Sequence, residues 1–221
     1  MINSKYTKIV IMLSFVLIVQ LSVILVVGSH LISHFSSLPL VNTADAQVDE
    51  AFKTYKNQKF GLTVSYPPDW SVDELRKDPM APSNNSIVVV LKSPSQGQND
   101  KYPENVIINI QGPKSEIVSF ENYTQKTLKD FNNVSDTIKI TKSSEAMLAG
   151  LPAHQLEYTS TGVQGLNLKK MQVFTVVNNN TAYVVTYGAE EPEYQKNLDN
   201  IEKLINSIKI DRFAMKNIQV D

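Results

Sequence analysis

Few side chains in this sequence have the type and spacing that chemistry requires, and His154 is the strongest candidate among them. It lies in the segment Ala153–Tyr158, where alternate residues of a strand share one face, so its ring points the same way as Leu156 and Tyr158. A general base or a metal ligand needs partner groups, and the other two histidines lie far away near the N-terminus. We therefore interpret His154 as a half-buried packing residue at the edge of the core, with a catalytic or metal-binding role as the alternative.

Three further groups of residues have side chains that metals bind. His30 and His34 are four apart, as helical ligands are, but no third ligand accompanies them, which favours a polar spacer. The other two groups are acidic, and neither has the spacing of an EF-hand. Carboxylates in the second acidic group would favour a helix N-terminus. We predict no metal site, and a hard-cation site remains the alternative. The two acidic groups are Asp73, Glu74 and Asp78, and Glu190, Glu191 and Glu193.

Composition excludes several classes of function. The chain has no cysteine, which rules out disulfides, thiolate nucleophiles, Cys-bound zinc and lipid attachment through a Cys. A net charge of -1 gives no indication of nucleic-acid binding. No G-x-S-x-G, P-loop or H-E-x-x-H motif occurs, so the sequence predicts no catalytic, cofactor-binding or metal-binding residue. Four N-x-S/T sequons are glycan acceptors if the chain is exported: Asn84, Asn122, Asn133 and Asn179.

The N-terminus gives the clearest indication of where the protein is located. Ile9–Val27 is 19 residues without a charge, which as a helix would be about 28 Å long, close to the thickness of a bilayer core. Lys5 and Lys8 precede this segment, and the next cation is Lys53. This asymmetry predicts a cytoplasmic N-terminus and an extracytoplasmic domain.

Cleavage of this segment stays open. Ala44-Asp45-Ala46 has the A-x-A pattern of a signal-peptidase site, and cleavage after Ala46 would release the domain. The apolar run and the leader would both be longer than in an ordinary signal peptide, which favours an uncleaved anchor. We expect a membrane anchor or signal segment over residues 1–27, a spacer over 28–50, one domain over 51–213 and a tail over 214–221.

Strand patterns dominate the domain. Phe60–Tyr66 alternates large apolar with small or polar residues and is stopped by Pro67-Pro68, after which Trp70–Val72 begins a short strand. Ile87–Leu91 is continuously apolar, as an interior strand covered on both faces is. Further strands are expected at 106–110, 137–142, 153–160, 167–177 and 181–188, and Asn178–Asn180 would join the last two in a tight hairpin. Trp70 is expected in the core beside the proline turn.

Two amphipathic helices complete the expected fold. The first would begin near Ser119, a favourable N-cap, and bury Phe120, Tyr123 and Phe131. The second has an apolar stripe from Tyr194 to Ile208. Short turns between successive strands indicate an antiparallel sheet, and both helices must bury their stripes against it. The sequence therefore predicts an α+β domain.

The segment Tyr55–Trp70, YKNQKFGLTVSYPPDW, resembles the opening motif of the PsbP family, the extrinsic photosystem II proteins and their non-photosynthetic relatives. The strand Ala182–Tyr187 followed by an amphipathic helix is similar to the end of the wider Mog1/PsbP-like fold. The resemblance covers roughly residues 52–211. It implies an antiparallel sheet flanked by helices, an α-β-α sandwich.

The family resemblance also implies a function. It indicates a noncatalytic accessory protein at the outer face of a membrane, bound to a protein partner or membrane complex, without a resident cofactor. Calcium is the cofactor that the family associations would add, and no motif assigns residues to it. The alternatives are a cell-envelope protein that binds a small molecule or metal ion, and a hydrolase whose site has no recognisable motif.

Overall fold

The computed structural model describes residues 51–74, 85–98, 100–112, 118–134, 138–162 and 165–214. The expected N-terminal segment, spacer and cleavage site lie outside these residues, as do His30, His34, Asp78, Asn84 and the tail beyond residue 214. Within the described ranges, no helix has both the length and the apolar character needed to cross a membrane.

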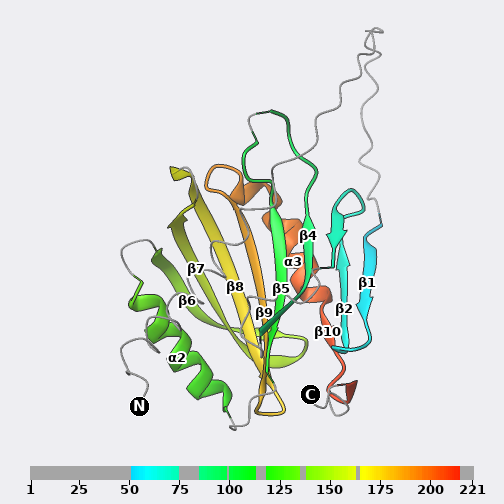
Figure 1. Cartoon of the computed structure of the whole chain (residues 1–221), viewed down its shortest axis with the longest axis vertical. Coiled ribbons are helices and arrows are strands. Elements are labelled where there is room, and N and C mark those ends of the chain that lie inside the picture. Colours follow the sequence, from blue (N-terminus) through cyan, green and yellow to red (C-terminus); the bar gives the residue numbers. More distant parts are fainter. Residues whose placement is uncertain are drawn as a thin grey trace, which may run out of the picture.

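Seven antiparallel strands form the main sheet, in the order β3-β4-β5-β9-β8-β7-β6 (Figure 1). The chain leaves β5, crosses to the far edge through a helix, and returns strand by strand until β9 pairs with β5. The strands are β3 (Ser71–Asp73), β4 (Asn85–Lys92), β5 (Asn105–Gln111), β6 (Ile138–Leu148), β7 (Leu151–Thr161), β8 (Asn167–Val177) and β9 (Thr181–Glu190).

A second sheet of three strands corrects the expectation of a single one. It has the order β1-β2-β10, with β1 (Lys53–Asn57), β2 (Leu62–Tyr66) and β10 (Lys209–Ile210). The alternation predicted for β2 is present, since Leu62, Val64 and Tyr66 are buried. The chain changes sheets at Pro67-Pro68, because proline cannot donate to a strand ladder, and the Trp70 N–H bonds to the Pro67 carbonyl across this turn.

Helices cover both faces of the main sheet. The helix α2 (Phe120–Asn132) packs on one face, and Ser119 caps it as predicted by accepting a hydrogen bond from the Asn122 N–H. The turn η3 (Tyr194–Asn197) and the helix α3 (Leu198–Ser207) lie on the other face beside the small sheet (Figure 1). The expected sheet flanked by helices is therefore present, with α3 and the three-stranded sheet sharing the second outer layer.

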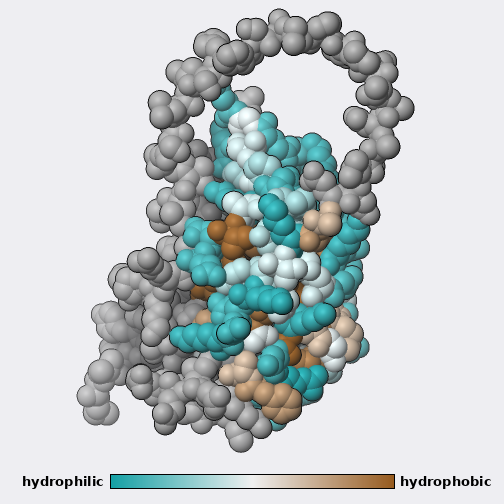
Figure 2. All heavy atoms as spheres, turned by 90° about the vertical axis from the view of Figure 1, so that its right-hand side faces the viewer, coloured by the Kyte–Doolittle hydropathy of each residue, from teal (hydrophilic) through white to brown (hydrophobic). Residues whose placement is uncertain are grey.

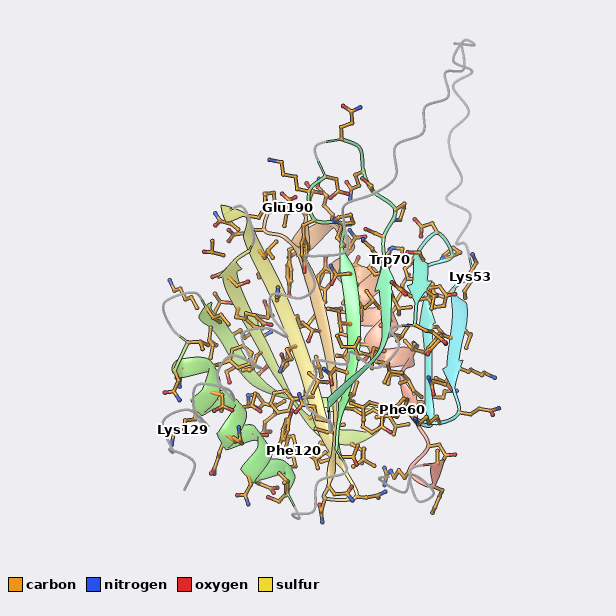
Figure 3. The ribbon with its side chains drawn as sticks, in the orientation of Figure 1. Lys53, Phe60, Trp70, Phe120, Lys129 and Glu190 are labelled. Atoms are coloured by element: carbon orange, nitrogen blue, oxygen red, sulfur yellow. The ribbon has the colours of Figure 1, made fainter. Side chains whose placement is uncertain are left out.

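Each face of the main sheet has its own apolar core. The larger cluster lies on the α3 side and includes Trp70, which is 6% exposed, as predicted. Figure 3 places Trp70 between the two sheets, at their connection. The smaller cluster lies under α2, where Tyr123 packs edge-on against Phe174 and Phe131 against Tyr158. Both amphipathic stripes of the sequence are thus buried.

Two tight hairpins set the register of strands β6 to β9. Asn178 and Asn179 adopt positive φ angles of 52° and 55° in the predicted β8–β9 turn. Ala149 and Gly150, with φ angles of 51° and 72°, form a similar turn between β6 and β7. The latter turn extends β6 to Leu148, six residues beyond the expected strand end at residue 142.

Candidate functional site

His154 lies on β7 between Glu145 of β6 and Phe174 of β8, which are its cross-strand partners. Its ring is partly buried and tilted against the Phe174 ring at 5.7 Å, and its Nε2 lies 2.8 Å from the Ser143 Oγ. Burial lowers the pKa of His154, and the nearby Glu145 carboxylate opposes this shift in part. Its predicted neighbours on that face, Leu156 and Tyr158, are fully buried under α2.

The contact between Ser143 and His154 has the length of a nucleophile–base hydrogen bond. A hydrolytic site also needs a group that orients the imidazole and donors that stabilise an oxyanion. Glu145 forms no ion pair with His154 within 4.0 Å, and Ser143 is exposed on the edge strand β6. The pair thus supplies two of the groups that acyl transfer requires, and its geometry equally suits a surface hydrogen bond.

The structure does not bring the acidic residues named in the sequence analysis together into a site. Asp73, the last residue of β3, and Glu74 are both exposed. Glu190 accepts a hydrogen bond from the Lys101 N–H, and Glu193 pairs with Lys196 at the turn η3, which precedes α3. In the described parts of the chain, no three His, Asp or Glu side chains come together in a cluster able to hold a metal ion.

A row of buried polar residues crosses the main sheet on the α2 side, and sequence analysis did not identify it. Successive cross-strand partners in this row are Tyr158, Lys170, Gly188 and Asn105, all buried. Burial lowers the pKa of Lys170 to about 8. The Tyr102 hydroxyl lies 3.0 Å from where a Cβ on Gly188 would be, so a larger residue at position 188 would press on this tyrosine.

A groove lies at the other end of the main sheet, between the β6–β7 turn and the segment that leaves α3. It has a volume of about 290 Å³ and is called the hairpin groove below. Met147, at its rim, is 61% exposed, whereas Ile205 and Ile208 on its floor are buried. The lining residues are Met147, Ala149, Gly150, Ile205, Asn206, Ile208, Lys209 and Ile210.

Figure 2 views the side of the molecule on which β1, β2 and β10 lie. Hydrophilic side chains cover much of this side, and apolar ones appear as separate patches between them. In Figure 3, Phe60 is labelled near the lower end of the molecule and Glu190 near its upper end. Phe213 is 73% exposed shortly after β10.

The three described sequon asparagines are also exposed: Asn122, Asn133 and Asn179.

These features define a small α+β module with two covered sheet faces and a groove beside the β6–β7 turn. The family model described as PsbP-like protein matches residues 10–210, which is most of the chain. The chain therefore belongs to the PsbP-like family, as the motif at Tyr55–Trp70 predicts. Comparison with curated protein sequences finds no match.

Several solved structures are similar to the domain. Cyanobacterial PsbP (CyanoP) from Synechocystis sp. PCC 6803 is 13% identical, covers 77% of this chain and 99% of its own, and gives a TM-score of 0.52. LpqN of Mycobacterium tuberculosis, described as involved in cell envelope biogenesis, is 14% identical over 74% of this chain and 87% of its own, with a TM-score of 0.48. The Saccharomyces cerevisiae Ran-binding protein Mog1p is 8% identical over 72% and 95%, with a TM-score of 0.46. At these identities the likeness concerns the fold alone.

Proposed function

We propose that this protein is a noncatalytic accessory subunit that is anchored by its N-terminus and binds a membrane protein complex at the outer face of a membrane. The family match carries the proposal, because it spans both most of the apolar run Ile9–Val27 and the domain as far as Ile210. An anchor and a domain that belong to one family unit suit a protein that acts at a membrane surface.

The chemistry of the domain supports binding over catalysis. The Ser143–His154 pair is open to solvent on the serine side, and Glu145, the acidic residue opposite His154, forms no ion pair with it that would orient the imidazole. Exposed large apolar side chains such as Met147 and Phe213 are available for contact with a protein partner.

One observation favours a second candidate, a cell-envelope protein that binds a small anionic molecule. The row of buried polar residues brings Lys170, Tyr158 and Asn105 to one face of the sheet. A buried cation flanked by hydrogen-bonding side chains has the chemistry that a site for a small anion uses. The experiment below separates this candidate from the first.

The test is isolation of the full chain from its native membrane in a mild detergent. A C-terminal affinity tag, native gel electrophoresis and mass spectrometry should reveal a membrane assembly much larger than the 24.7 kDa chain, with the same partner in repeated preparations. Lys139→Met, at an exposed position on β6, is a suitable control variant that should leave the assembly intact. Recovery of a monomer carrying a small organic anion would favour the second candidate, and a bare monomer would contradict both.

A further inference from the structure

The N-x-S/T sequons are a feature of the chain that the proposed function does not use. Asn122, Asn133 and Asn179 each begin such a motif, and each has an exposed side chain. The two asparagines that are buried in β5, Asn105 and Asn109, begin no motif. A sugar chain is bulky and hydrated, so the folded domain accommodates it only at exposed positions. All three described sequons meet this requirement.

The side-chain amides of these asparagines are not needed by the fold. Within the described ranges, the amides of Asn122, Asn133 and Asn179 take part in no hydrogen bond, whereas the neighbouring Asn178 amide donates to the Arg212 carbonyl at 3.1 Å. A sugar attached to one of the three nitrogens would therefore break no side-chain hydrogen bond of the folded domain.

The three sites lie around one helix, α2. Asn122 is in the first turn of this helix, and Asn133 is its C-cap residue. Asn179 is in the β8–β9 turn, which lies beside the start of α2 because the Val118 N–H donates a hydrogen bond of 2.7 Å to the Asn179 carbonyl. This turn and the start of α2 are both at the lower end of the molecule in Figure 1. Sugar chains at the three sites would thus flank the outer face of α2.

The third residue of a motif shows when a sugar could be attached. The transferase must reach the Ser or Thr hydroxyl together with the Asn amide. Thr124 lies two positions after Asn122 on α2, where side chains two apart do not face each other, and its hydroxyl is buried. Thr181, which completes the motif of Asn179, is 2% exposed in β9. These two motifs are therefore accessible as a whole only before the domain folds.

We propose that the domain carries N-linked sugar chains at Asn122, Asn133 and Asn179, attached during export and before folding. The co-substrate is an oligosaccharide joined to a membrane lipid through pyrophosphate. A transferase forms the bond between the Asn Nδ2 and the anomeric carbon of the sugar. The bond from this carbon to the pyrophosphate breaks, the lipid pyrophosphate leaves with the electron pair, and one amide proton passes to a base of the transferase.

This inference rests on the proposed function, because sequons are glycosylated on the extracytoplasmic side of a membrane. It also limits where a partner binds. A hydrated sugar chain keeps other proteins away from the surface beside it, so the outer face of α2 lies outside the interface with the partner.

The first test is peptide mass spectrometry of the full chain isolated from its native membrane. We expect a glycopeptide for each of the three sites, and each of Asn122→Gln, Asn133→Gln and Asn179→Asp should lose its own. Aspartate is used at position 179 because, like asparagine, it tolerates the positive φ angle of 55° found there. Asn132→Gln is the matched control and should keep every glycopeptide, because Asn132 is exposed beside Asn133 but begins no motif.

A pair of variants at position 124 tests the chemistry of attachment. Thr124→Ser keeps the motif and should keep the sugar at Asn122, whereas Thr124→Ala breaks the motif and should lose it. A sugar that remains in Thr124→Ala would show attachment by another route and overturn the inference. Unmodified peptides at all three sites overturn it as well, and so does modification confined to Asn84, which lies outside the described residues.

The second test concerns the order of attachment and folding. Full chain produced without sugars and a synthetic peptide of residues 119–127 are each incubated with an oligosaccharyltransferase and a lipid-linked oligosaccharide. The peptide should be modified at Asn122 at least about tenfold faster than the folded chain, because the folded chain must first open α2. Equal rates would overturn attachment before folding.

The third test concerns the outer face of α2. Gln125→Asn makes a further motif with Thr127 on this helix, and the added sugar should leave the native membrane assembly intact. Gln125→Ala is the control without a motif. Loss of the assembly in Gln125→Asn alone would place the partner on α2 and contradict the inference.

Failure of the inference and failure of the proposed function are distinguishable. If the native assembly is recovered but the domain carries no sugar, the inference fails while the proposed function stands. If the three glycopeptides are found but no assembly exists, the proposed function fails and the glycosylation sites stand.

Discussion

At the scale of single residues, burial of Lys170 sets a measurable pH dependence. The side chain is 3% exposed, and desolvation lowers its pKa from 10.5 to about 8. Between these values the unfolded chain holds a proton that the folded chain lacks, so the free energy of unfolding rises with pH, by up to about 1.4 kcal/mol for each pH unit. Below pH 8 the cost of the buried charge is constant.

We therefore expect Lys170→Met to remove this rise. Its free energy of unfolding, measured by urea denaturation of the full chain, should be nearly flat where the parent protein gains stability between pH 8 and 10. Above pH 10 both proteins should lose stability, because burial raises the pKa of Tyr123, Tyr158 and Tyr187 in the folded state. Lys139→Met at an exposed site should follow the parent curve. Parallel curves for Lys170→Met and the parent would contradict the prediction.

Trp70 joins the two sheets, and its loss should destabilise both. It belongs to the core cluster on the α3 side and follows the proline turn that redirects the chain. Trp70→Ala should lower the free energy of unfolding by about 3–5 kcal/mol, because it leaves a large cavity. Trp70→Phe, which keeps a ring, should cost clearly less. Chemical denaturation checks both values, and an unchanged midpoint for Trp70→Ala would remove this residue from the core.

His154 decides between a packing role and a catalytic one. His154→Gln should lower stability by about 1–2 kcal/mol, since the side chain packs on Phe174 and bonds to Ser143. Binding to the native assembly, measured well below the unfolding temperature, should stay close to that of the parent. Ser143→Ala is the matched control, because it removes the same hydrogen bond without touching the ring. A variant that folds normally but loses a measurable esterase turnover would favour the hydrolase alternative.

At the scale of elements, the N-cap of α2 is a local feature that sequence and structure share. The Ser119 hydroxyl accepts a hydrogen bond from the Asn122 N–H at 3.2 Å. Ser119→Ala should destabilise the protein by about 1 kcal/mol, and Ser119→Asp should preserve or slightly raise stability because a carboxylate also caps and favours the helix dipole. Thermal unfolding followed by circular dichroism checks this order. Equal melting temperatures for the three proteins would mean that the cap contributes nothing.

The elements that sequence predicts well are those with local causes. Ser119 and the stripe around Tyr123 specify α2, and the alternation from Leu62 to Tyr66 specifies β2, because caps and periodicity act over a few residues. The β8–β9 turn follows from asparagines that tolerate positive φ angles. The bounds of β8, residues 167–177, match the expectation because polar turns enclose the strand on both sides.

Features with non-local causes were not predictable in the same way. Whether β2 joins the main sheet or a separate one depends on pairing with β10, almost 150 residues away in the sequence. The polar end of β6 carries no apolar alternation, so its register, and with it the Ser143–His154 contact, depends on the Ala149-Gly150 turn. Gly150 was the available indication of this turn in the sequence, since glycine adopts positive φ angles readily. Burial of Lys170 and the hairpin groove arise only when distant strands assemble.

At the scale of the whole molecule, the N-terminal segment predicts on which side of the membrane the domain lies. The domain has an apolar cluster on each face of its main sheet and three exposed sequons, at Asn122, Asn133 and Asn179. The N-terminal segment, with Lys5 and Lys8 before the apolar run and no further cation until Lys53, predicts that this core lies outside the cytoplasm. A partner would then reach the domain from the extracytoplasmic side.

Protease added to intact cells should therefore digest the domain, and a C-terminal epitope tag should disappear before the cells are lysed. The folded core resists cleavage at low protease concentration, so a protease site inserted beside exposed Gly97, in the loop between β4 and β5, makes the result independent of unfolding. The matched control exchanges charges across the apolar run: Lys5 and Lys8 become Gln, and Ser29 and Ser33 become Lys. Because cations flanking a spanning segment favour the cytoplasm, the exchanged protein should insert in the opposite orientation and become protected. Digestion only after lysis in the parent chain would place the domain inside the cell and contradict both the anchor orientation and an outer-face partner.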